Sequence, residues 1–161
     1  MLSKPNGCPA VSIIICALNE EESVVRVLSK IPNWIDEILL VDGHSTDNTI
    51  ETARMTLPKI KVLSQPGIGK GDALRCGITS ATGEIIVTLD ADDATDPNEI
   101  NKFINALLRG YDFAKGSRLI KGKTYNKPWY RIAGNCIITI TFDILFLRPY
   151  TDICSGYNAF W

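Results

Sequence analysis

The chain has 161 residues, 45% of them hydrophobic, and carries a formal net charge of −1 at pH 7. A chain of this length folds as one domain that buries roughly 68–70% of its unfolded surface, so neither a disulfide nor a structural metal is needed to stabilise a core. The composition excludes a disordered chain, and without a basic excess we expect no nucleic-acid partner.

Cysteine usage and the N-terminus favour a cytoplasmic protein. The five cysteines are scattered, odd in number and form no Cys-x-x-Cys pair, so we expect reduced, buried thiols. The first ten residues lack the apolar stretch of a signal peptide. The longest apolar stretch, Cys136 to Leu147, contains polar residues and is too short to cross a bilayer. We expect a soluble protein or one that lies at the inner face of the membrane.

The first expected strand and helix lie between residues 11 and 32. Residues 11–16 are almost continuously apolar, which is typical of a strand covered on both faces by helices. Asn19 is expected to cap the next helix, whose first turn holds three glutamates. Its apolar residues recur at helical spacing until Pro32, where we expect the helix to end.

Two further strands are expected at residues 37–41 and 60–63, with a short helix between them. Asp42 directly follows the first of these strands. A glycine-rich loop, residues 65–71, follows the second and leads into another helix. The residues that this helix is expected to bury are Ala73, Leu74, Gly77, Ile78 and Ala81.

Residues 85–89 form a short apolar run that stops at a cluster of carboxylates, Asp90, Asp92 and Asp93. The run is too short for an independent helix, so we expect a buried strand with the acids at its carboxyl end, where open α/β sheets bind ligands. Two carboxylates about 4 Å apart repel by roughly 4 kcal/mol at an effective dielectric of about 20, and a hard divalent cation would relieve that repulsion. The pattern predicts a metal–diphosphate site, with a solvated acidic turn as the alternative.

The last third of the chain begins with an amphipathic helix, capped by Asp96 and ended by Gly110. Residues 111–115 are expected to form a strand and residues 116–128 a mobile basic loop. Residues 129–147 fit a helix despite their β-branched side chains. Strands alternating with helices predict an α/β fold, with a mostly parallel sheet and helices on both faces.

Polar motifs follow three of the expected strands in a characteristic order: Asn19-Glu20, then Asp42, then Asp90-Ala91-Asp92. This order resembles the family 2 glycosyltransferases of the GT-A fold, and more narrowly the polyprenyl-phosphate branch that is similar to dolichol-phosphate mannosyltransferase. The strings that carry the resemblance are VSIIICALNEEESV, EILLVDGHSTDNT, GKGDALRCGI, GEIIVTLDADDATDP, AKGSR and TDICSGYNAFW. They cover the chain from about Val11 to its end.

The resemblance implies one GT-A domain over residues 1–161, with the C-terminal part of the acceptor region missing from the chain. It implies inverting transfer of a hexose from a nucleotide-sugar donor, a UDP- or GDP-sugar, with Mg²⁺ or Mn²⁺ as cofactor. The implied acceptor is a polyprenyl phosphate or a related molecule, so peripheral contact with a membrane is also implied. The sugar, the base and the oligomeric state stay open.

The resemblance also assigns roles to individual residues. Asp90 and Asp92 match the metal-binding Asp-x-Asp motif, and with Arg118 they would be the catalytic groups. Glu20 would bind ribose hydroxyls and Asp42 the base. The full set of implied donor-binding residues is Ala17, Leu18, Asn19, Glu20, Asp42, Lys70, Asp90, Ala91, Asp92, Arg118 and Arg131. The turn Ser155-Gly156-Tyr157 would lie near the acceptor phosphate.

No clear catalytic base is visible beyond the acidic cluster, Asp143 and Asp152. Transfer to a sugar hydroxyl needs a base, whereas a lipid phosphate is already an anion and can attack directly. The polyprenyl-phosphate acceptor is therefore favoured. The alternatives are a family 2 transferase that acts on a soluble hydroxyl acceptor and a catalytically incomplete nucleotide-sugar-binding domain.

Simpler explanations compete for several residues. Asp42 precedes a glycine, a pair that favours turns, so it can be a turn residue instead of a base contact. His44 is the only histidine and has no neighbouring nucleophile in sequence, so we expect a loop contact and not a catalytic role. Ala94 stands where relatives often place a polar metal-associated side chain, and Asp93 is the candidate to replace it.

Overall fold

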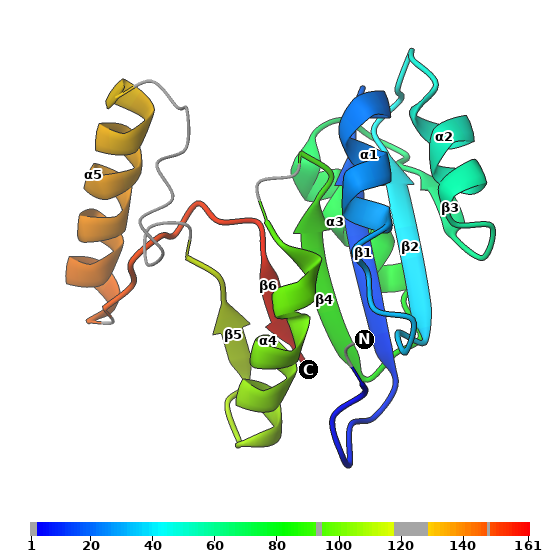
Figure 1. Cartoon of the computed structure of the whole chain (residues 1–161). Helices are drawn as coiled ribbons and strands as arrows, with labels where there is room; N and C mark the ends of the chain where they lie inside the picture. Colours follow the sequence, from blue (N-terminus) through cyan, green and yellow to red (C-terminus); the bar gives the residue numbers. More distant parts are fainter. Residues whose placement is uncertain (1–2, 93–94, 118–128, 148) are drawn as a thin grey trace.

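The computed structural model describes residues 3–92, 95–117, 129–147 and 149–161, with the backbone alone for residues 129–132. Within these residues six strands form one sheet, in the order β3-β2-β1-β4-β6-β5 (Figure 1). The strands are β1 Val11–Ala17, β2 Glu37–Asp42, β3 Lys61–Ser64, β4 Ile85–Asp90, β5 Phe113–Lys115 and β6 Asn158–Phe160. The expected α/β architecture is confirmed.

The first four strands, β1 to β4, are parallel, and their pairing aligns their carboxyl ends. Ala17 of β1 pairs with Asp42 of β2, and Cys16 pairs with Asp90 of β4. β6 runs antiparallel to both β4 and β5. The sequence pattern did not predict β6, whose three residues directly follow the turn Ser155-Gly156-Tyr157. The polar motifs that follow β1, β2 and β4 therefore lie at one edge of the sheet.

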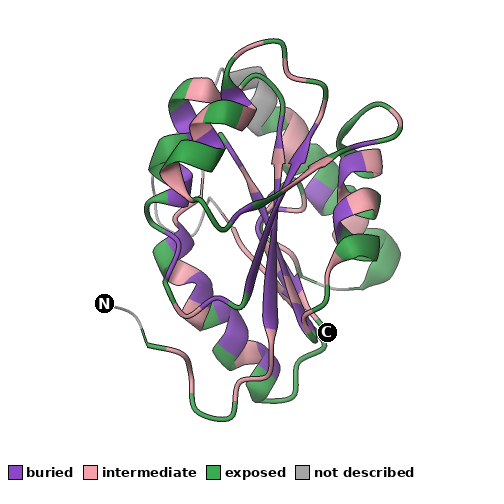
Figure 2. Cartoon of the chain, turned by 90° about the vertical axis from the view of Figure 1, so that its right-hand side faces the viewer, coloured by how far each residue is buried: buried purple, intermediate pink, exposed green. Residues whose placement is uncertain are grey.

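Helices cover both faces of the sheet. The described helices are α1 Glu21–Leu28, α2 Thr49–Thr56, α3 Lys70–Ser80, α4 Ile100–Leu108 and α5 Trp129–Phe146, with a 3-10 turn, Pro97–Glu99, before α4. Buried residues of α1, α2 and α4 join one core cluster with Ile13 and Ile15 of β1, whereas α3 packs on the other face against Ile14. Figure 2 shows the buried residues concentrated along the strands and on the inner sides of the helices.

Close packing of α3 depends on a glycine. A Cβ atom on Gly77 would lie 2.5 Å from Cγ2 of Ile14 and 3.1 Å from Cγ2 of Val41. The helix thus approaches β1 and β2 more closely than any side chain at this position would allow. This approach places the first residue of α3, Lys70, at the carboxyl edge of the sheet.

Several local predictions were wrong. Asn19 does not cap α1: its φ of 55° is left-handed, and its side chain accepts a hydrogen bond from the backbone N–H of Thr46. The helix begins at Glu21 and ends at Leu28, before Pro32. Ile78 is 39% exposed instead of buried, because α3 turns this side to solvent. Asp96 caps the 3-10 turn Pro97–Glu99, where its side chain accepts a hydrogen bond from the backbone N–H of Asn98, and not α4 itself, whose N-cap is Glu99.

The cysteines are free, as expected, but the prediction that they are buried was wrong. Cys8, Cys16 and Cys76 are half-buried, and Cys136 and Cys154 are exposed. Cys136 lies on α5, an element that does not enter the main core, and Cys154 lies in the segment between α5 and β6.

Helix α5 stands beside the main body of the domain (Figure 1) and turns its polar side inward. Asn135, Thr139 and Asp143, spaced four residues apart, each make a hydrogen bond with segment 150–153. The large apolar side chains point outward instead: Ile137, Ile138, Ile140, Ile144, Leu145 and Phe146 are all more than half exposed. Among the described residues, α5 included, no helix is long and apolar enough to cross a membrane.

Candidate functional site

A cavity of about 390 Å³ lies at the carboxyl ends of the parallel strands. Its walls come from the turns after β1, β2 and β4 and from the loop that leads into α3. The lining residues are Cys16, Ala17, Leu18, Glu20, Gly43, Gln65, Ile68, Gly69, Lys70, Ala73, Asp90, Ala91 and Asp92. Seven of the eleven predicted donor-binding residues are among them, so segments far apart in sequence do meet at this edge.

The end of β1 supplies Ala17, and the turn after it supplies Leu18 and Glu20. The backbone N–H of Glu20 donates to Oγ1 of Thr49 at 2.9 Å, and its carboxylate accepts a hydrogen bond from the hydroxyl of Ser23. Asn19 is not a lining residue, because its side chain is turned toward Thr46. Asn19 instead ties the turn after β1 to the turn after β2.

Asp42, at the end of β2, is buried below the cavity wall instead of lining it. Its side chain is 3% exposed and accepts hydrogen bonds from the backbone N–H groups of His44, at 3.0 Å, and Ser45, at 3.1 Å. This is the turn geometry typical of an aspartate before a glycine. The next residue, Gly43, is the one that reaches the cavity.

The acidic motif after β4 faces the first residue of α3. Oδ1 of Asp90 lies 2.5 Å from Nζ of Lys70, and Asp92 is an exposed residue in the same wall. The amino end of α3 carries partial positive charge, which adds to the charge of Lys70 opposite these carboxylates. The positions of Asp93 and Ala94 fall outside the described residues.

The turn Ser155-Gly156-Tyr157 packs directly against Asp90. A Cβ atom on Gly156 would come within 2.7 Å of both Cγ of Asp90 and Nζ of Lys70. The carbonyl oxygen of Gly156 accepts a hydrogen bond from Oγ1 of Thr88 in β4, at 2.9 Å. The sequence predicted this turn beside an acceptor phosphate, and the structure places it at the acidic motif.

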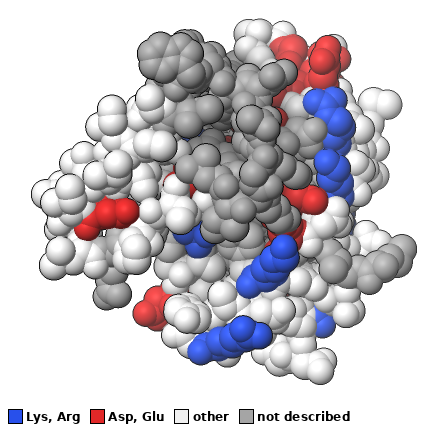
Figure 3. All heavy atoms as spheres, turned by 60° about the vertical axis from the view of Figure 1, so that its left-hand side comes forward, with Lys and Arg blue, Asp and Glu red and all other residues white. Residues whose placement is uncertain are grey.

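Two predicted cations cannot be placed. Arg118 lies outside the described residues, and of Arg131 the structure describes only the backbone, in the first turn of α5. On the face shown in Figure 3, the described Lys and Arg side chains are interspersed with Asp and Glu and form no continuous basic patch.

The residues present fit a divalent cation that shares its ligands with a substrate. Within the described chain, no group of three or more His, Cys, Asp or Glu side chains is placed to hold a metal ion. Asp90 and Asp92 nevertheless line one cavity, and Mg²⁺ commonly binds one or two carboxylates together with phosphate oxygens of the substrate. A metal here would need the diphosphate to complete its coordination.

Six lining residues were not predicted: Cys16, Gly43, Gln65, Ile68, Gly69 and Ala73. The strand-end positions of Cys16 and Gly43 could have indicated them. Nothing in the sequence marks Gln65 or Ile68, whose place depends on how the loop folds. Burial of the Cys16 thiol, reinforced by the Asp90 carboxylate, raises its pKa to about 11, so this cysteine is a neutral thiol at physiological pH.

Comparison with known proteins identifies the family. The model of glycosyl transferase family 2 matches residues 12–160. The chain belongs to glycosyl transferase family 2. This family 2 chain is 35% identical over 159 residues to a dolichol-phosphate mannosyltransferase of Pyrococcus furiosus, covering 92% of this chain and 45% of that protein. It is 34% identical over 122 residues to an undecaprenyl-phosphate 4-deoxy-4-formamido-L-arabinose transferase of Yersinia enterocolitica, covering 69% and 37%.

Solved structures show the same fold. The glucosyl-3-phosphoglycerate synthase of Mycobacterium tuberculosis matches this family 2 domain with a TM-score of 0.74 and 23% identity, over 94% of this chain and 57% of that chain. The same enzyme has been solved in complex with Mn²⁺ and UDP-glucose. The chain spans about half the length of the curated relatives, from 37% to 65%. The expected GT-A fold and membership of the family are confirmed.

Proposed function

We propose that this chain is the donor-binding part of a metal-dependent, inverting glycosyltransferase that moves a hexose from a nucleotide-diphosphate sugar to a polyprenyl phosphate or a related acceptor. The observation that carries the proposal is the meeting of Glu20, Lys70 and the Asp90–Asp92 motif in one cavity. Support comes from relatives that are named for transfer to dolichol or undecaprenyl phosphate.

The nucleoside would lie against the turns after β1 and β2. Ala17, Leu18 and Glu20 line the cavity there, so the carboxylate of Glu20 is the group proposed to bind ribose hydroxyls. Asn19 and Asp42 would act by holding these turns in place, because both side chains already bond to backbone N–H groups. A direct contact between Asp42 and the base stays a prediction.

The diphosphate would lie between Lys70 and the acidic motif. Asp90 and Asp92, with Ala91 between them, would hold Mg²⁺ or Mn²⁺, which would offset the negative charge that grows on the leaving diphosphate. Lys70 now neutralises Asp90 and could turn to a phosphate oxygen once a metal neutralises that carboxylate. Arg118 and Arg131 are proposed from the sequence as further phosphate-binding cations.

The hydrogen bonds of the candidate bases favour a phosphate acceptor. Asp143 accepts from the backbone N–H of Tyr150, and Asp152, which is 2% exposed, accepts from the side chain of Asn135. Both carboxylates therefore fix α5 to the domain. A hydroxyl acceptor needs a base to remove its proton, whereas an anionic lipid phosphate does not. Transfer to a soluble hydroxyl acceptor would need a base from elsewhere.

Metal-dependent nucleotide binding tests the donor site. We expect titration calorimetry of the 161-residue chain to show binding of UDP or GDP with Mn²⁺ and its loss with EDTA. Asp92→Ala should weaken this binding by at least about tenfold, the lower end of what losing even an indirect metal partner costs. Asp112→Ala, which removes an exposed aspartate outside the cavity wall, serves as control.

The outcomes separate the alternatives. If the folded protein binds neither nucleotide, the donor-site proposal is wrong. Binding that Asp92→Ala leaves unchanged would refute the metal assignment. Binding without transfer to polyprenyl phosphate, even by the whole enzyme, would favour the nucleotide-sugar-binding domain.

A membrane-bound acceptor also gives the outward face of α5 a role. We propose that this face rests on the cytoplasmic membrane surface, with its exposed isoleucines against acyl chains. The sequence from residue 116 to 131 adds five Lys and Arg residues and no acid, which suits anionic lipid headgroups.

Vesicle binding checks this contact. We expect the chain to sediment with phosphatidylglycerol-containing vesicles, and the double variant Ile137→Ser/Ile144→Ser to lower the partition coefficient at least about 100-fold, because two apolar side chains each lose about 1.5 kcal/mol or more of burial. The matched control is Met55→Ser, which removes an 84% exposed apolar side chain from α2. Equal binding by all three proteins would refute the contact.

A further inference from the structure

Two large apolar side chains line the cavity although they are exposed to solvent. Ile68 is 94% exposed and Leu18 is 57% exposed. They come from different segments: Leu18 from the turn after β1, and Ile68 from the loop that joins β3 to α3. Such exposure costs free energy, so both side chains would gain from contact with an apolar surface in the cavity.

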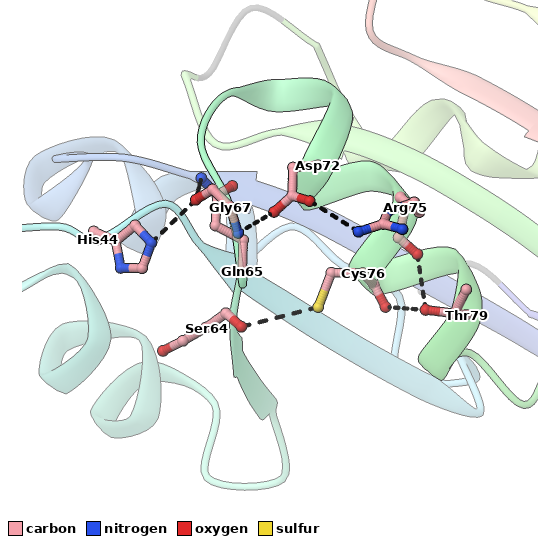
Figure 4. Close-up of polar contacts among 8 residues, drawn as sticks. All are labelled: His44, Ser64, Gln65, Gly67, Asp72, Arg75, Cys76 and Thr79. Atoms are coloured by element: carbon pink, nitrogen blue, oxygen red, sulfur yellow. Dashed lines mark hydrogen bonds and ion pairs between the residues drawn. The ribbon is translucent and has the colours of Figure 1, made fainter.

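The loop that carries Ile68 is fixed at the peptide just before it. Figure 4 shows the backbone N–H of Gly67 donating to Oδ2 of Asp72, at 2.7 Å. The carbonyl oxygen of the same residue accepts from Nε2 of Gln65 at 3.0 Å and lies 3.2 Å from Nε2 of His44. Three side chains, from the loop itself, from α3 and from the turn after β2, thus hold Gly67, the residue directly before Ile68.

His44 reaches this loop from the turn after β2. Its backbone φ of 68° lies in the left-handed region, which is uncommon for a residue other than glycine. The buried carboxylate of Asp42 accepts a hydrogen bond from the backbone N–H of His44, and this bond stabilises the left-handed conformation. The expected loop contact of His44 is therefore present, and it links the end of β2 to the loop above the cavity.

The same loop has a charged end. Two residues after Ile68 comes Lys70, whose ammonium group pairs with Asp90. The lining of the cavity thus combines apolar groups, Ile68 and Leu18, with charged groups, Lys70, Asp90 and Asp92. A nucleotide-diphosphate sugar is likewise divided into an apolar and a charged part, because its base presents planar, weakly polar faces and its diphosphate carries the charge.

We propose that Ile68 and Leu18 contact the faces of the donor's nucleobase, and that His44 is a positioning residue that holds Ile68 there through the carbonyl group of Gly67. This inference rests on the proposed donor site. It assigns the base to the loop after β3 as well as to the turns after β1 and β2, and it gives a function to the only histidine of the chain.

Comparing a ligand with a base and a ligand without one tests the inference. The chain is titrated, with Mn²⁺ present, with UDP, with GDP and with inorganic pyrophosphate. Ile68→Ser should weaken binding of the preferred nucleotide about tenfold, in keeping with the loss of one buried apolar side chain, and leave pyrophosphate binding unchanged. Met55→Ser again serves as the matched control for loss of an exposed apolar side chain.

His44 is tested by one substitution that removes the side-chain hydrogen bond and one that retains a donor for it. His44→Gly keeps the left-handed backbone easily accessible but removes the ring, and should weaken nucleotide binding by about threefold or more without affecting pyrophosphate. His44→Gln retains a donor for the carbonyl group of Gly67 and should restore most of the affinity. This pattern separates positioning of the loop from relief of backbone strain.

Each failure has its own meaning. If the wild-type chain binds no nucleotide with metal, the donor site and this inference are both wrong. If it binds a nucleotide with affinity that Ile68→Ser and His44→Gly leave unchanged, the donor site stands and the base contact is wrong. Equal losses for nucleotide and pyrophosphate would also overturn the inference, because the effect would then reach the phosphate end.

Discussion

Gly156→Ala should cost the whole enzyme about 100-fold in its rate of sugar transfer, the loss that follows when a reacting group is displaced by about 1 Å. The new methyl group would overlap the carboxylate of Asp90, since its carbon would lie only 2.7 Å from Cγ. Lys70 can swing its flexible ammonium group away. Asp90 has a short side chain, so its carboxylate must leave the position proposed to bind metal.

The turn itself has little freedom to move away. The carbonyl oxygen of Gly156 is bonded to Thr88, and Asn158 begins strand β6, which pairs with β4. Calorimetry with Mn²⁺ and the preferred nucleotide should therefore show weaker binding alongside the loss of transfer. The matched control is Gly134→Ala in α5, where a Cβ atom would meet no atom within 4 Å.

Wild-type rates for Gly156→Ala would mean that Asp90 does not need its present position, and the metal assignment would lose its main geometric support. An unfolded variant would show in circular dichroism. The smaller change Lys70→Met then separates the two partners of Gly156, because it removes the cation and leaves the space around Asp90 unchanged.

Glu37→Gln should lower the free energy of unfolding by about 3 kcal/mol at pH 7, the second large effect. Glu37 begins β2 and is 8% exposed. Burial alone would raise its pKa, but hydrogen bonds from Lys61, Ser12 and Thr82 outweigh burial and lower the pKa from 4.5 to about 2. The bond to Nζ of Lys61 is 2.6 Å long and the bond to Oγ of Ser12 is 2.5 Å long.

The sign of the pH dependence follows from the lowered pKa. The folded protein keeps Glu37 ionised to lower pH than the unfolded chain, so its stabilising effect is complete above about pH 4.5 and is lost as pH falls toward about 2. Urea unfolding at pH 7 and pH 3 should show a smaller pH difference for Glu37→Gln than for the wild type. Glu84→Gln, an exposed glutamate near the same edge, should change neither value. Similar pH curves for all three proteins would contradict this account.

The strand ends were predictable because the signal is local. Residues 85–89 are apolar and stop at carboxylates, and a parallel sheet brings all such ends to one edge. Asp90 and Asp92 were therefore expected at the cavity that they line. The expected helix after residue 129 is likewise confirmed, since its length compensated for its β-branched residues.

The turns were less predictable, because their side chains had several possible partners. Asn19 was expected to cap a helix and instead bonds to the turn after β2, while Asp42 holds that turn from a buried position. The side-chain oxygen of Asn19 can accept a hydrogen bond either from the first turn of a helix or from the turn after β2. Only the packing of the two turns on each other selects the second partner. Ile78 was expected in the core for its spacing alone, but α3 presents it to solvent.

The sequence by itself determined the order of strands β1 to β5 and of the helices, the edge that holds the site and the membership of a glycosyltransferase family, because these depend on local hydrophobic runs and short motifs. The tertiary structure alone decided which groups meet: Lys70 with Asp90, Gly156 against both, and His44 with Gly67. The residues in each contact are 20 or more positions apart. The contact of Gly156 also depends on the three-residue strand β6, which pairs with β4. Long-range contacts of this kind arise from the packing of the whole chain, which no local pattern encodes.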